Sequence, residues 1–111
     1  PPAPDTYLPG GMLIVVVELE SRASEPVSVS AAKVFVDDQL EEQGLPRSAI
    51  CDDKLGTDGA SAVVCEAEVP YNSIEQRDGR LESARAALGE MKREAPTRLD
   101  GTELATGGSG V

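Results

Sequence analysis

Two segments of this chain repeat their apolar residues with the two-residue period of a β-strand, and they constrain the fold more than any other feature. The segment 12–20 places four apolar side chains on one face, namely Leu13, Val15, Val17 and Leu19. The segment 61–69 does the same with Val63, Cys65, Ala67 and Val69. This spacing predicts a strand in each segment. The other face of 12–20 is half apolar, which is typical of a strand in the middle of a sheet.

A helical pattern separates these two strands. Within 30–43, one face carries the apolar residues Ala32, Phe35, Val36 and Leu40. This spacing predicts a helix that packs its apolar face on a sheet. Gly44 is expected to end the helix in a left-handed conformation, and Pro46 prevents its continuation.

A second helical pattern follows the strand at 61–69, which Pro70 is expected to end. The spacing of a capping box occurs at 73–76, but Gly79 weakens the turn after it, so we expect the helix to run over 80–94. Its apolar positions are Leu81, Ala84, Leu88, Met91 and Ala95, with Pro96 as the stop.

Two weaker strand patterns complete the order of elements. One spans 47–52 and leads into turn residues over 52–59, while the other spans 97–104 and is interrupted at Asp100 and Gly101. The order β-α-β-β-α-β is that of the split βαβ, or ferredoxin-like, arrangement. The sequence therefore predicts an α+β fold in which two helices cover one face of an antiparallel sheet.

The chain of 111 residues is long enough for one small domain. We expect an extended proline-rich arm over 1–10, a single domain over 11–105 and a flexible glycine-rich tail over 106–111. Because only three residues are aromatic, the core must consist mainly of Val, Leu, Ile and Ala. The residues expected to be mostly buried are Val15, Val17, Phe35, Leu40, Val63, Leu81 and Leu88.

The charge and composition exclude several classes of function. The formal net charge is −10 and the chain contains no histidine, so it cannot hold a catalytic triad or zinc site that requires imidazole. Nucleic acid would be repelled by such an acidic protein. The most apolar run, 12–17, is too short to cross a bilayer, so we expect no membrane insertion.

The two cysteines, Cys51 and Cys65, have thirteen residues between them and fall on strands expected to be neighbours. We predict a structural disulfide between them, which implies an oxidising setting such as an extracytoplasmic compartment or a virion. The alternative is two free thiols in a cytoplasmic protein. The spacing is not that of a C-x-x-C redox motif, and two thiolates alone do not complete a tetrahedral metal site.

Acidic pairs occur at 37–38, 41–42 and 52–53, and we interpret them as solvated helix and turn residues. Their spacing does not match a calcium-binding loop, and the glycine-rich segments do not match a phosphate-binding loop. The sequence therefore assigns no catalytic, metal-binding or cofactor-binding residue, and it implies no cofactor.

The absence of a nucleophile–base pair and of a cofactor motif favours a structural or interaction subunit that is not an enzyme. Its partners would be other protein chains, in a homo- or hetero-oligomer, with the extended termini docked on them. One alternative is a small ferredoxin-like enzyme that uses a carboxylate or Tyr71 as its acid or base. Another is a secreted ligand-binding or inhibitor module.

Overall fold

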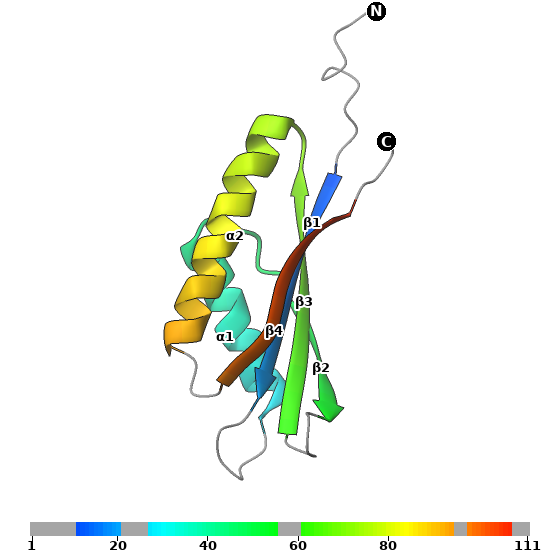
Figure 1. Cartoon of the computed structure of the whole chain (residues 1–111), viewed down its shortest axis with the longest axis vertical. Helices are drawn as coiled ribbons and strands as arrows, with labels where there is room; N and C mark the ends of the chain where they lie inside the picture. Colours follow the sequence, from blue (N-terminus) through cyan, green and yellow to red (C-terminus); the bar gives the residue numbers. More distant parts are fainter. Residues whose placement is uncertain (1–10, 21–26, 56–60, 95–97, 108–111) are drawn as a thin grey trace, which may run out of the picture.

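The computed structural model describes residues 11–20, 27–55, 61–94 and 98–107. Its elements in chain order are β1 (Gly11–Glu20), α1 (Val29–Glu42), β2 (Ile50–Leu55), β3 (Ser61–Tyr71), α2 (Ile74–Glu94) and β4 (Arg98–Gly107). Both helices lie on the same side of the strands (Figure 1). The expected class, a small α+β domain with an antiparallel sheet and two helices, is confirmed.

The strands lie in the order β2-β3-β1-β4. β1 pairs with β3 along its whole length, with Val15 opposite Ala67 and Val17 opposite Cys65. β2 pairs with the other edge of β3, and β4 pairs with the other edge of β1, each in the antiparallel sense. β1 is therefore flanked on both sides, as its two partly apolar faces predicted.

The alternation predicted for β1 and β3 is present in the core. The inward residues of β1 are all buried: Leu13, Val15, Val17 and Leu19. Those of β3 are buried as well: Val63, Cys65, Ala67 and Val69. The face of the sheet that these residues form, which the helices cover, is called the inner face below. The opposite face is called the outer face.

Helix α1 is capped at both ends, by Ser28 at its start and by the predicted Gly44 at its end. At the start, the Ser28 hydroxyl accepts a hydrogen bond from the Ala31 N–H at 3.3 Å. At the end, Gly44 has a φ of 77°, as predicted. Its N–H donates to the Glu41 carbonyl, and the Leu45 N–H donates to the Leu40 carbonyl, each at 2.9 Å. These two bonds form a Schellman motif, which turns Leu45 back into the core.

Helix α2 begins at Ile74 and not at Arg80, so the expected start was wrong by more than a turn. The Ser73 hydroxyl accepts from the Gln76 N–H at 3.0 Å, and the Gln76 side chain accepts from the Asn72 N–H at 2.7 Å. These caps satisfy backbone donors at the helix start. They outweigh the cost of Gly79, about 1 kcal/mol in an exposed helix interior.

Two strand boundaries also differ from the expectation. β2 begins at Ile50, which had been placed at the strand centre, and it includes the residues over 52–55 that had been assigned to a turn. The remainder of that predicted turn, 56–59, lies outside the described residues. β3 continues through Pro70 to Tyr71.

The geometry of the sheet explains why Pro70 does not end β3. The Ser48 hydroxyl donates to the Glu68 carbonyl at 3.3 Å, so the backbone N–H and C=O of Glu68 point toward β2. Residues two apart in a strand point their backbone groups the same way, so those of Pro70 also point toward β2. Pairing with β2 stops where Ile50 meets Glu66. The missing N–H of Pro70 therefore leaves no bond to β2 unmade.

Strand β4 contains the interruption that Asp100 and Gly101 suggested. Val16 pairs with Glu103 but Glu18 pairs with Asp100, so the register shifts there as in a β-bulge. β4 extends to Gly107 and so includes the first two residues of the segment predicted as a tail. The predicted arm over 1–10, the rest of the tail and the predicted stop at Pro96 lie outside the described residues.

The expected core is found in part. Val15, Val17, Leu40 and Val63 are buried, whereas Phe35, Leu81 and Leu88 are half-buried and pack against the core from its margin. The face of α2 that meets the core instead carries the buried residues Ala84, Ala87 and Met91. Leu81 and Leu88 lie beside this face and pack against the core while partly exposed.

Candidate functional site

The two cysteines lie directly opposite each other in the register of β2 and β3. Their sulfur atoms are 2.08 Å apart, at disulfide distance, and their Cα atoms are 4.0 Å apart. Cys65 is fully buried among the inner residues of β3, and Cys51 is half-buried at the edge of the core. The pair therefore links the edge strand β2 to the interior of the sheet.

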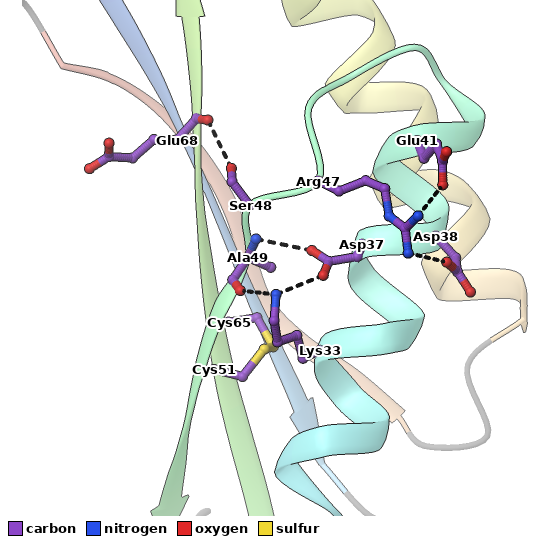
Figure 2. Close-up of polar contacts among 10 residues, drawn as sticks. All are labelled: Lys33, Asp37, Asp38, Glu41, Arg47, Ser48, Ala49, Cys51, Cys65 and Glu68. Atoms are coloured by element: carbon purple, nitrogen blue, oxygen red, sulfur yellow. Dashed lines mark hydrogen bonds and ion pairs between the residues drawn. A yellow bond between two sulfur atoms is a disulfide. The ribbon is translucent and has the colours of Figure 1, made fainter.

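A polar contact next to this pair ties α1 to the start of β2. The Asp37 carboxylate accepts from the Ala49 N–H at 3.0 Å and from the Lys33 ammonium at 2.7 Å. The same ammonium donates to the Ala49 carbonyl at 2.8 Å. Figure 2 shows these three groups converging beside the disulfide. Since both backbone groups of Ala49 are bonded here, we call this contact the Ala49 clasp.

The clasp corrects the interpretation of one acidic pair. Asp37 was expected on a solvated helix face, but it is only 7% exposed. Its neighbour Asp38 is exposed and contacts Arg47 at 3.4 Å, as does Glu41 at 3.0 Å. One carboxylate of the pair is therefore structural, and the other belongs to a surface ion-pair network.

Tyr71, which the sequence offered as an acid or base, packs at the end of β3 against the start of β1. It is buried and lies directly over Gly11, its register partner on β1. A Cβ atom added to Gly11 would come within 2.1 Å of the tyrosine ring. Gly11 therefore leaves the space that the ring fills, and Tyr71 acts as a packing residue.

The outer face of the sheet carries an open groove of about 650 Å³. Apolar residues from all three neighbouring strands line it: Met12 of β1, Ile50 of β2, and Val64 and Pro70 of β3. Pro46, which follows α1, also lines it. Ile50 is 70% exposed, the most exposed large apolar residue among the described part of the chain.

Three carboxylates stand among these apolar residues: Asp52 of β2, and Glu66 and Glu68 of β3. Figure 2 shows the Glu68 side chain pointing away from α1. Within the described residues, no ion pair involves any of the three. The only basic residue that β2 presents nearby is Lys54, and its ammonium is bound to Glu18 at 3.2 Å.

The sequence did not identify this groove. The half-apolar second face of 12–20 predicted only a strand in the middle of the sheet, and Asp52 was expected where the strand 47–52 meets the turn. The available signal was the alternation of Val64, Glu66 and Glu68, in which charged and apolar residues share one face. Such mixing is typical of a surface and not of a core.

Within the ranges that the structure describes, no three His, Cys, Asp or Glu side chains gather in a way that could hold a metal ion. Neither α1 nor α2 is long and apolar enough to cross a membrane. The chain matches no protein-family model, no curated protein and no solved structure. The function is therefore argued from the groove and its residues.

Proposed function

We propose that this domain is an interaction module that is not an enzyme and that binds another protein chain through the outer face of its sheet. The observation that carries the proposal is the groove, in which exposed apolar side chains lie on a face that neither helix covers. An exposed apolar surface rimmed by polar groups is typical of a site of protein interaction.

The arrangement of elements supports a ferredoxin-like assignment of the fold. The order along the chain is β-α-β-β-α-β, and the order in the sheet is β2-β3-β1-β4. Such a fold has no inherent function, so the assignment adds nothing to the choice of partner. The suggestion that residues 1–10 and the tail also dock on partners stays part of this proposal.

The cysteine pair supports a location in an oxidising compartment, such as an extracytoplasmic space or a virion. Disulfides persist in such compartments and are reduced in most cytoplasms. Thiol titration of the purified protein, unfolded in denaturant without reductant, tests this part. No reactive thiol is expected, and two reactive thiols would favour the cytoplasm.

Site-directed photo-cross-linking tests the interaction itself. A photoreactive residue in place of Ile50 should cross-link to a partner in the cells that produce the protein, and the same residue in place of Val34 on α1 should not. Val34 is a matched control because it is also exposed and apolar, at 57%. The partner should then bind the purified domain, with loss of affinity in Ile50→Ser and none in Val34→Ser. Equal cross-linking at both positions would contradict the proposal.

A further inference from the structure

We infer that the partner segment seated in the groove is basic: an extended stretch of another protein in which Lys or Arg alternates with apolar residues. This inference rests on the proposed function and specifies its partner. It follows from three properties of the groove, namely its charge, the mixture of its lining and the spacing of its carboxylates.

The charge of the groove favours a cationic occupant. Asp52, Glu66 and Glu68 line it, and none of them lies in an ion pair within the described residues. The molecule as a whole has a net charge of −10, which adds to the negative potential at this face. A second copy of this chain would bring the same three carboxylates against one another, so self-association through the groove is disfavoured.

The mixture of apolar and acidic groups in the groove favours a partner whose positive charges are those of Lys or Arg side chains. Val64 lies between Asp52, its register partner, and Glu66, two residues further along β3. A single side chain of the partner must therefore both cover apolar surface and reach a carboxylate. Lys and Arg do this, since their aliphatic stems lie along apolar surface while the charged group remains at the rim.

The spacing of the carboxylates favours an extended segment. Glu66 and Glu68 are two residues apart on one face of β3, which separates their Cα atoms by about 7 Å. An extended partner repeats its side chains at the same interval. Two of its basic residues can therefore lie over the two glutamates, with their aliphatic stems against Met12, Val64 and Pro70.

The test uses three synthetic peptides of about eight residues, which is long enough to cross the sheet face. Each alternates valine with one other residue: lysine, glutamine or glutamate. Binding to the isotope-labelled protein is followed by NMR, which reports both the affinity and the residues in contact. We expect the lysine peptide to bind most tightly, with shifts at Ile50, Val64 and Glu68, and to weaken as salt is raised.

Two charge variants separate the groove from the charge of the whole molecule. Glu66→Gln with Glu68→Gln should weaken binding of the lysine peptide about fivefold, since two partly exposed ion pairs are lost. The control, Glu42→Gln with Glu82→Gln, removes the same charge from exposed helix positions and should leave the affinity unchanged. An equal loss in both variants would overturn the inference, because it would show attraction to the net charge alone.

The peptide series also distinguishes failure of this inference from failure of the proposed function. If the glutamine peptide binds in the groove as tightly as the lysine peptide, the groove is an interaction site but its partner is not basic. If none of the peptides shifts the residues of the outer face, both the inference and the proposed interaction surface are wrong.

Discussion

Both faces of β1 carry apolar residues, one along its whole length and the other along half of it, yet only the first belongs to the core. Leu13, Val15 and Val17 are buried beneath the helices, whereas Met12 and Ile14 alternate with them and remain half-buried on the outer face. Part of the difference lies in β1 itself, whose outer face also carries Glu18 in an ion pair with Lys54. The rest comes from the neighbouring strand β3, where the inner residues are uniformly apolar and the outer residues include Glu66 and Glu68.

The comparison shows how a strand with apolar residues on both faces can have one face in the core and the other in contact with solvent. Helices with apolar faces cover the inner side, since burial of apolar surface stabilises by roughly 25 cal/mol per Å². Carboxylates on β3 oppose burial of the outer side, because an unpaired charge is costly to remove from water. Four predictions test this distinction.

The largest difference should appear between adjacent residues of β1. Leu13→Ala should lower the free energy of unfolding by about 3–4 kcal/mol, because the side chain is fully buried and a cavity remains. Ile14→Ala, on the outer face, should lower it by about 1 kcal/mol, since that side chain already contacts solvent. Urea denaturation of both variants measures the difference. Equal losses would mean that the outer face is also buried in the folded protein.

Removal of the disulfide should release β2 from the inner face. Cys51→Ser with Cys65→Ser should lower the free energy of unfolding by about 3 kcal/mol, because the unfolded chain regains the freedom of an open loop. Reductant should destabilise the original protein by a similar amount and leave the double variant unaffected. Thermal unfolding with and without dithiothreitol measures both effects, and an original protein insensitive to reductant would argue against the bond.

The buried and the exposed carboxylate of α1 should also differ in how much they contribute to the free energy of unfolding. Asp37→Ala should cost about 2 kcal/mol, because the Ala49 N–H loses its acceptor in a buried position. Asp38→Ala is the control and should cost about 0.5 kcal/mol or less, as expected for an exposed ion pair. Asp37→Asn keeps one acceptor oxygen and should lie between them. Denaturant titration of the three variants gives the order.

The smallest effect on stability is expected where charge alone keeps the outer face in solvent. Glu66→Val with Glu68→Val should change the free energy of unfolding by only about 0.5 kcal/mol. It should, however, make the protein self-associate, because the groove becomes a continuous apolar patch. Sedimentation velocity measures this. A strictly monomeric variant would show that the two glutamates are not what keeps this face exposed.

Much of the inner face could be predicted from the sequence, because it depends on local periodicity. The alternation around Val15 and Cys65 and the cap at Gly44 each involve residues close in the chain. The start of α2 was missed, since the cost of Gly79 is visible in the sequence but the bond between Gln76 and Asn72 depends on the conformation of the turn before it.

The outer face could not be predicted in the same way. Whether an apolar strand face is covered depends on which side both helices take, which is decided by contacts between distant segments. The clasp of Asp37 on Ala49 is also non-local, because it joins residues twelve apart across the turn after α1. The alternation of charge on β3 was the available signal for an uncovered face.

The Cys51–Cys65 bond has a further consequence for the covalent path of the chain. It closes a ring that contains the whole connection from β2 to β3. If one peptide bond within this ring were hydrolysed, the molecule would gain a water yet remain a single covalent species, with its edge strand still attached to the sheet. Only subsequent reduction would separate two fragments. The covalent attachment of β2 to β3 therefore does not depend on an unbroken backbone between them.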